Sequence, residues 1–331
     1  MALSLVEIAA YTEQLIVPRT VDTIYKNSPV FTRLHTKNME RFNGGLYIQT
    51  PIIFAELNGG AVSKGQAFNI DPVNTDTALV NYMRLYYVNI SLYGYDSIAN
   101  DGPLAALNQV ETKFVNAGLK MGKLLGVNMY LDSTSPGRGN QLDGLQMWYD
   151  DGSIYPVVGG ITRSDIMPVG TVGGLNAYTA TTTAFNLQQL NVAYGNAWFG
   201  SDHVDLIQAT QNGWNLVWNA MQPSQRYLDK ESDVGVAGFQ SLRFNASEIV
   251  IDKYAPSAQT GSTSLATNGT MIGINTNYVY WYFSSNPKFR FGWTGFKEGQ
   301  NTIDVAGQQL VANQIVVPNP RTGFKILSSS F

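Results

Sequence analysis

The chain has 331 residues, a net charge of −3 and no cysteine. This length suits two packed lobes, or one lobe with sizeable extensions. The absence of cysteine excludes disulfides, thiolate metal sites and cysteine nucleophiles. The small negative charge argues against a protein whose main task is to grip nucleic acid through its phosphates, although a local basic patch stays open.

Charged residues make up only 14% of the chain, against roughly 25% in an ordinary soluble domain. Much of the surface must therefore be Asn, Gln, Ser, Thr and Gly, which favours association with other proteins. The first residues show no secretory signal, and no apolar run approaches the roughly 18 residues of a membrane span. We expect a soluble protein that is made in the cytosol.

The N-terminal part predicts a short amphipathic helix over 4–17, ended by Pro18, and a second helical segment over 21–34. Between residues 18 and 41 the cations outnumber the anions. The cations are Arg19, Lys26, Arg33, Lys37 and Arg41, and the anions are Asp22 and Glu40. Two interpretations stay open, an ordinary solvated face and a surface for an acidic partner or packaged nucleic acid.

Two alternating runs at 46–54 and 80–93 predict long strands, with a turn at Asn58-Gly59-Gly60. Together they resemble a two-stranded arm. The segment between them, 61–76, would not hold a fold alone. An isolated ribbon is marginal in water, so either another chain supports the arm or the hairpin lies on its own domain.

The stretch 101–133 predicts one long helix, with Asp101 as cap and Pro103 at the first helical position. Apolar residues recur at helical spacing and form one stripe: Leu107, Val110, Phe114, Ala117, Met121, Leu124 and Leu125. Gly118, Gly122 and Gly126 line another side. They indicate either a bend or close approach of another backbone, or simple packing against a strand.

The rest of the chain predicts a mixed α and β lobe and terminal strands. We expect strand material in 144–158 around Met147-Trp148-Tyr149, helices over 185–198 and 210–221, strands at 204–208, 242–252 and 270–283, a polar loop over 256–268, and terminal strands at 289–296, 309–317 and 324–327. The terminal strands are expected to need the long helix as cover.

No catalytic, cofactor or metal site is predicted. The only histidines, His35 and His203, lack carboxylates at metal-ligand spacing, although Asp202 and Asp205 flank the second. Asp150 and Asp151 are adjacent, which is typical of a turn. The Gly-rich run 170–174 lacks the Gly-Lys-Ser/Thr ending of a phosphate loop, and no Gly-x-Ser-x-Gly elbow occurs.

Trp214 and Trp218 lie four residues apart on one helical face. Such a pair is usually core, but it can also stack against sugars or bases. This leaves two alternative functions. One is a carbohydrate-binding surface module that uses the two tryptophans and Tyr-rich strands, and the other is a glycan hydrolase that uses acids among Asp150, Asp151, Asp202 and Asp205.

Several short motifs occur in an order that resembles the major capsid protein of tailed bacteriophages, whose fold is named after phage Hong Kong 97. Each motif is weak alone, and their shared order over nearly the whole chain carries the resemblance. They are Gly44-Gly45-Leu46-Tyr47-Ile48, Val88-Asn89-Ile90-Ser91-Leu92, Leu131-Asp132-Ser133, Gly144-Leu145, Tyr155, Gly160-Ile161-Thr162-Arg163-Ser164, Val204-Asp205-Leu206-Ile207, the run from Phe244 to Asp252, and Asn319-Pro320-Arg321.

The resemblance implies an α+β fold of the Hong Kong 97 type, in which a spine helix lies on an antiparallel peripheral sheet beside a mixed α/β axial domain. The implied parts are an N-terminal arm (1–42), an extended E-loop hairpin (43–96), a peripheral domain with the spine helix (97–185), an axial domain (186–287) and peripheral return strands (288–331). Axial loops such as 256–268 would gather at capsomer centres.

The resemblance also implies a non-enzymatic structural role without cofactors. Subunits would form hexamers and pentamers that close an icosahedral shell around a double-stranded DNA genome, in the virion and, during assembly, in the host cytoplasm. Scaffolding, portal and decoration proteins are further implied partners, with non-specific proximity to packaged DNA and no membrane.

Two departures from the family pattern matter. The arm begins at Met1, so any scaffold is expected to be a separate protein or absent. Lys64 near the hairpin tip is a candidate for the covalent cross-link that some members form with a neighbour's Asn, but no partner motif is visible.

Overall fold

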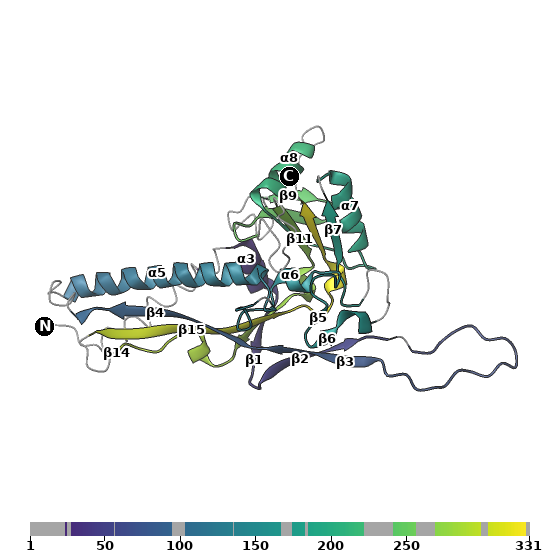
Figure 1. Ribbon diagram of the computed structural model, residues 1–331, viewed down its shortest axis with the longest axis horizontal. Coiled ribbons are helices and arrows are strands. Elements are labelled where there is room, and N and C mark those ends of the chain that lie inside the picture. Colours follow the sequence, from purple (N-terminus) through teal and green to yellow (C-terminus); the bar gives the residue numbers. More distant parts are fainter. Residues whose placement is uncertain are drawn as a thin grey trace.

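The computed structural model describes residue 24 and residues 28–55, 57–94, 103–134, 136–166, 174–182, 185–221, 241–255, 269–298 and 304–328. It combines a long arm, a lobe that rises beside one end of the arm, and a hairpin that projects away from both (Figure 1). Several features expected from the sequence lie outside this description. They are the helix over 4–17, Arg19, Lys26, Asp101, the side chain of Leu107, residues 170–173 and the loop 256–268.

The long arm, which is a different part from the N-terminal arm expected over residues 1–42, contains a six-stranded sheet built around β15 (Val305–Val316). We call this sheet the arm sheet. The order β1-β12-β15-β13 forms its main path, and β4 and β14 also pair with β15. β1 runs parallel to β12, and the other pairs are antiparallel. The remaining strands are β1 (Met39–Phe42), β4 (Arg84–Leu92), β12 (Tyr280–Ser284), β13 (Arg290–Trp293) and β14 (Lys297–Glu298).

The long helix α5 (Pro103–Tyr130) lies along this sheet, which confirms the prediction from the sequence (Figure 1). Its apolar stripe is buried at Val110, Phe114, Ala117, Met121 and Leu125. The Phe114 ring lies 4.7 Å from that of Trp293, in an edge-on contact. Burial of such side chains contributes about 1.5–3 kcal/mol each, so the stripe fixes the helix to the sheet.

The three glycines of α5 are buried. At Gly126 a Cβ atom would lie 2.5 Å from the ring of Tyr254, which follows β10. Glycine at this position therefore makes room for the Tyr254 ring. The sequence had indicated either the close approach of another backbone or packing against a strand.

The lobe contains a second six-stranded sheet, ordered β7-β16-β11-β8-β10-β9. Helices α7 (Leu187–Asn196) and α8 (Gln211–Ala220) pack against it. Both helices and β8 confirm the predictions. The strands are β7 (Tyr178–Thr182), β8 (Leu206–Ala209), β9 (Ser241–Phe244), β10 (Ser247–Ile251), β11 (Gly269–Ile274) and β16 (Phe324–Ser328).

Several predicted strands are divided between sheets. The run 270–283 is split by the short 3-10 helix η3 (Thr276–Tyr278) into β11 of the lobe and β12 of the arm. The run 324–327 was expected beneath the long helix, but it forms β16 in the lobe, between β7 and β11. The run 242–252 is the hairpin β9–β10, which turns at Asn245 with φ of 52°.

The run 80–93 also divides. β3 (Asp76–Tyr82) pairs with β2 (Tyr47–Ile53), whereas β4 joins β15 in the arm sheet. The predicted strand around residues 147–149 is wrong, because Leu145–Trp148 forms a single helical turn, α6, with all four side chains buried. Residues buried on every side carry no period that distinguishes a strand from a helix.

Helix α3 (Pro29–Lys37) overlaps the predicted segment 21–34 and ends three residues beyond it. It binds the lobe through ion pairs. Arg33 pairs with Glu248 of β10 at 3.5 Å, and Lys37 with Asp205 at 3.0 Å. Arg33 and Lys37 therefore contact acids of their own chain. Neither interpretation from the sequence, a solvated face or a surface for an acidic partner, predicted these ion pairs. Arg41 is exposed.

Candidate assembly surfaces

The hairpin β2–β3 is fixed to the body at its base. Leu79 is fully buried and Ile48 is 4% exposed. The backbone N–H of Val80 donates to the carbonyl of Gly159 at 2.8 Å, in the turn between β5 (Val157–Val158) and β6 (Ile161–Thr162). Gly159 has φ of 55°, and a Cβ atom there would lie 2.7 Å from Leu79. The turn therefore needs glycine to receive the strand.

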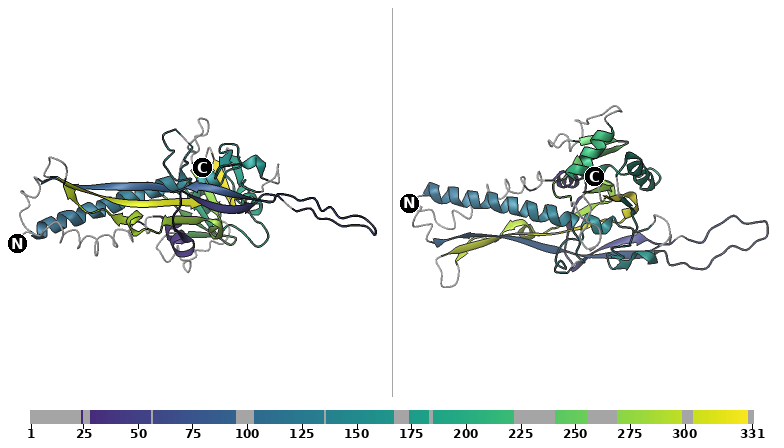
Figure 2. Two further views of the ribbon diagram at one scale, coloured as in Figure 1. Left: turned by 90° about the horizontal axis from the view of Figure 1, so that it is seen from below. Right: turned by 45° about the horizontal axis from the view of Figure 1, so that its top comes forward.

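Beyond Ile53 the hairpin leaves the body of the protein (Figures 1 and 2). The described residues from 57 to 74 are all exposed, and Ser63 to Gln66 forms a turn. Apolar side chains are among them, with Leu57 at 75%, Phe68 at 73% and Ile70 at 88% exposure. We call residues 57–75 the tip. It buries too little apolar surface to fix its conformation within one chain.

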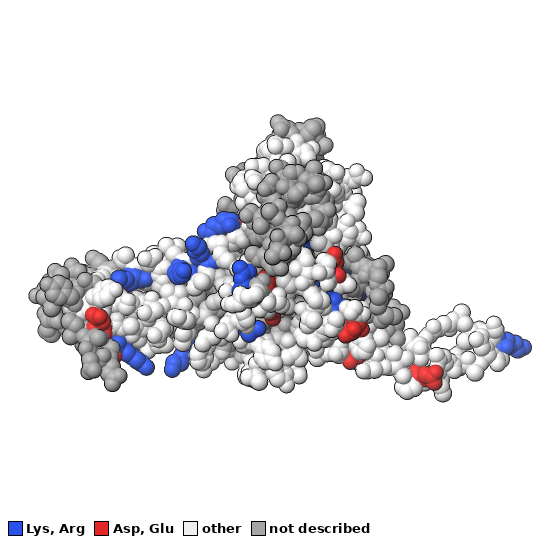
Figure 3. All heavy atoms as spheres, viewed as in Figure 1, with Lys and Arg blue, Asp and Glu red and all other residues white. Residues whose placement is uncertain are grey.

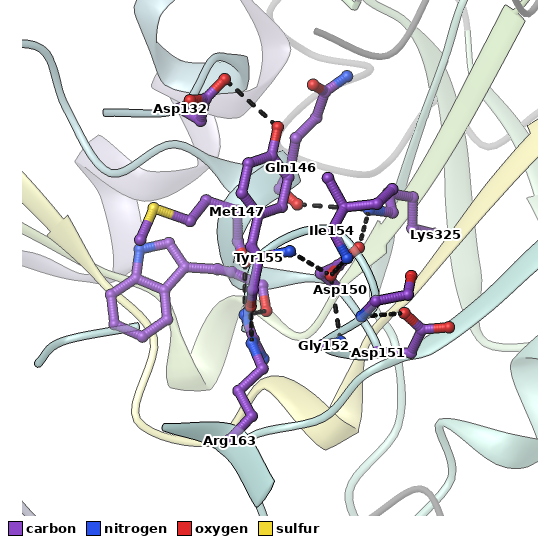
Figure 4. A network of polar contacts seen from close by, with 12 residues as sticks. Asp132, Gln146, Met147, Asp150, Asp151, Gly152, Ile154, Tyr155, Arg163 and Lys325 are labelled. Atoms are coloured by element: carbon purple, nitrogen blue, oxygen red, sulfur yellow. Dashed lines mark hydrogen bonds and ion pairs between the residues drawn. The ribbon is translucent and has the colours of Figure 1, made fainter. Parts of the chain in front are cut away.

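In contrast to the exposed tip, a buried polar network joins the lobe to the arm. We call its residues Asp132, Asp150, Tyr155, Arg163 and Lys325 the junction (Figure 4). The Lys325 ammonium on β16 donates to Asp150 Oδ1 at 2.6 Å, and neither side chain is exposed. Asp150 Oδ2 accepts the backbone N–H groups of Gly152, Ile154 and Tyr155 at 3.0–3.2 Å. The carboxylate thus joins the lobe sheet to the loop after α6.

Arg163 extends this network on the other side of Tyr155 (Figure 4). It is 2% exposed and donates only to backbone carbonyls, at Met147, Trp148, Tyr155 and Leu175. The Tyr155 hydroxyl in turn donates to Asp132 Oδ2 at 3.3 Å, just beyond the end of α5. The junction therefore holds α5, α6 and β16 in one arrangement.

The charges of the junction set the protonation of its acid. Burial alone would raise the pKa of Asp150, but Lys325 and the backbone donors hold that pKa below its ordinary value of 3.8. Burial lowers the pKa of Lys325, and Asp150 opposes this shift. Two other buried acids behave differently, because burial raises the pKa of Asp143 and of Asp252.

The acids considered for glycan hydrolysis do not form one site. Asp150 is bound within the junction, and the adjacent Asp151 accepts the N–H of Ser153 in the turn. Asp205 accepts from Thr276 and Lys37, and Asp202 accepts the Tyr278 hydroxyl at 2.6 Å. Each carboxylate thus has a structural partner.

The two histidines are also separate. His35 is exposed on α3, and His203 lies beside the Trp198 ring, with Nδ1 3.2 Å from the Ser201 carbonyl. Among the described residues, no cluster of three or more His, Asp or Glu side chains could hold a metal ion. In the same part of the chain, no helix combines the length and apolar character needed to cross a membrane.

Trp214 and Trp218 stack on each other, with ring centroids 5.2 Å apart. Trp214 is only 8% exposed and belongs to the lobe core, against which Trp218 packs. This arrangement matches the core interpretation, because one ring of the pair is not accessible to a sugar.

Sequence reasoning missed the two central cations of the junction. Lys325 interrupts an apolar strand, and a lone cation in such a run is the signal that could have indicated a buried ion pair. Arg163 was noted only as part of a motif. Lys64, the cross-link candidate, is exposed in the tip.

The fold of this chain is similar to that of known proteins, although its sequence is not. No protein-family model matches the sequence, and no curated protein matches it. Among solved structures, the capsid of cyanophage A-1(L) has 11% identity and a TM-score of 0.64 over 92% of both chains. The capsid of a native GTA particle has 8% identity and a TM-score of 0.54 over 90% of both chains.

An encapsulin is also similar. The SrpI encapsulin of Synechococcus elongatus PCC 7942 has 7% identity and a TM-score of 0.53, over 89% of this chain and 85% of the other. The resemblance to phage capsid proteins is thereby confirmed at the level of the fold. The chain has a mixed α and β fold similar to that of Hong Kong 97-like capsid proteins and encapsulins.

Proposed function

We propose that this chain is the major capsid subunit of a tailed bacteriophage, and that many copies close an icosahedral shell around a double-stranded DNA genome. The observation that carries the proposal is the tip. It presents Leu57, Phe68 and Ile70 to solvent at 73% exposure or more, far from any core of its own chain. A neighbouring subunit that covers these side chains would recover their burial energy.

The parts of the subunit follow from this proposal. Residues 1–42 form the N-terminal arm, 43–96 the E-loop with β2 and β3, 97–185 the peripheral domain with α5 as spine helix, 186–287 the axial domain, and 288–331 the return strands. Strand pairing modifies these boundaries, since β7 and β16 belong to the lobe sheet and β12 to the arm sheet. The subunit acts in the virion, and in the host cytoplasm during assembly.

Assembly into hexamers and pentamers is the central expectation, with scaffolding, portal and decoration proteins as further partners. The test is to express the chain alone and with its neighbouring phage proteins, and to examine the product by sedimentation and negative-stain microscopy. Closed shells of uniform size support the proposal. A chain that stays monomeric at high concentration and in all salts, without shells in either expression, overturns it.

The encapsulin similarity favours a second candidate, a shell that encloses protein instead of a genome. The content of purified shells distinguishes the two. DNA within the shells and their connection to a portal support the capsid, whereas shells that retain one co-expressed protein and no DNA support a compartment.

A further inference from the structure

Helix α5 carries a row of lysines beside its buried apolar stripe, from Lys113 on the flank of the stripe to Lys123 on the side away from the sheet. Lys120 and Lys123 are exposed and Lys113 is partly exposed. At 3.6 residues per turn the three lie within about 80° around the helix axis and extend about 15 Å along it. We call these three residues the lysine ridge. Figure 3 shows basic side chains spaced along the level of α5.

The described part of the chain provides no counter-charge to the ridge. Glu111 is the only acid of α5, and it lies at least about 120° around the helix from each ridge lysine. Within the described part of the chain, none of the three lysines forms an ion pair. The Lys253 ammonium lies 4.8 Å from the ring of Tyr254, which packs on Gly126 of the same helix. No described residue therefore neutralises the positive charge of the ridge.

The opposite broad face of the arm has a different character. There the outward residues of β4 and β15 carry no charge, and Leu85 and Tyr87 are 54% and 65% exposed. The helix face of the arm thus carries the three ridge lysines, whereas the outward side of the sheet carries Lys297 of β14, opposite Ala306. In a shell, one of these faces meets the enclosed polyanion and the other does not.

We infer that the lysine ridge of α5 lines the inside of the shell and contacts the phosphate backbone of the enclosed nucleic acid. This inference rests on the proposed function for the direction in which the ridge faces. Each lysine neutralises a phosphate and releases a counterion, so the contact is independent of base sequence and sensitive to salt. Three contacts per chain are weak alone, and the many copies in a shell add together.

The first test measures the unassembled chain with a labelled DNA duplex, by fluorescence anisotropy across a salt series. The variant Lys120→Gln/Lys123→Gln is compared with Lys288→Gln/Lys297→Gln, which removes two exposed lysines elsewhere. The ridge variant is expected to reduce the slope of log affinity against log salt by about 2, and the control variant to leave it unchanged. Equal slopes in both variants overturn the inference. Dependence of poly-glutamate binding, but not of DNA binding, on the ridge also overturns it in favour of an acidic protein partner.

The second test determines which face is inside. Intact shells filled with nucleic acid are treated with a bulky amine-reactive reagent that cannot enter, and labelled lysines are mapped by mass spectrometry. Labelling of Lys120 and Lys123 is expected to fall at least tenfold relative to dissociated subunits. Full labelling in intact shells overturns the inference while leaving the shell itself established. A failure to form any shell concerns the proposed function, and the anisotropy result stands apart from it.

Discussion

The junction and the tip use their side chains in opposite ways. At the junction a lysine, an aspartate and an arginine are withdrawn from water and fully bound to their own chain. At the tip, apolar side chains such as Phe68 and Ile70 stay in water. Burying the charges of the junction costs desolvation free energy, so each charged group needs all its hydrogen-bond and ion-pair partners. The apolar side chains of the tip have no such partners within the described part of the chain. The comparison indicates that folding energy and assembly energy come from different parts of this chain.

The junction predicts the largest effect of a substitution. Asp150→Asn leaves the Lys325 ammonium buried without a counter-charge, and we expect it to lower the free energy of unfolding by about 3–5 kcal/mol. Urea unfolding of the unassembled chain measures this. The matched control is Asp151→Asn, since Asp151 is exposed and accepts one N–H in the turn. Equal losses for both variants would contradict a special role of the buried pair.

The pH dependence of this difference sharpens the same prediction. Because the folded protein holds the pKa of Asp150 below its ordinary 3.8, its carboxylate stabilises the fold at every pH above that value. The stabilisation is lost only as pH falls through the lower folded pKa. The difference in unfolding midpoint between wild type and Asp150→Asn should therefore not shrink between pH 7 and about 4, and the two should converge below pH 4. A difference that shrinks already between pH 7 and 5 would mean that burial dominates the protonation of Asp150.

An intermediate effect is expected where the hairpin joins the body. Gly159 and Gly160 both have positive φ, at 55° and 77°, but only Gly159 faces Leu79. We expect Gly160→Ala to cost about 1–2 kcal/mol from backbone strain, and Gly159→Ala to cost about 1–3 kcal/mol more from overpacking. Unfolding of both variants, with hydrogen exchange at Val80, measures this. Identical losses would mean that β3 can move away from the turn.

The smallest effect on stability is expected at the tip. Phe68→Ser/Ile70→Ser should change the free energy of unfolding by no more than about 0.5 kcal/mol, and deletion of 59–76 should leave a folded subunit. Both should impair shell formation, as measured by sedimentation and microscopy. Leu79→Ala at the buried base of the same hairpin is the control, with an expected loss of about 2–5 kcal/mol. Loss of folding on deletion of the tip would show that it supports its own chain.

The sequence by itself determined the local elements with strong periodicity. α5, α7, α8 and β8 follow from apolar spacing. In the structure α7 starts after Asn186, whose side chain accepts the N–H of Gln189, a local cap that the predicted range 185–198 did not specify. These features depend on contacts among near neighbours in the chain, so they are visible in a window of ten to thirty residues. The order of the short motifs additionally indicated the fold.

Only the tertiary structure decided which sheet each strand joins and which charges meet. β16 pairs with β11 across more than 50 residues of chain, and Lys325 meets Asp150 at a separation of 175 residues. Such pairings are selected by the burial of whole elements against each other, and no local pattern encodes them. The same reason explains the missed turn of α6 and the internal pairing of Arg33, since burial on every side removes the periodic signal on which sequence reasoning depends.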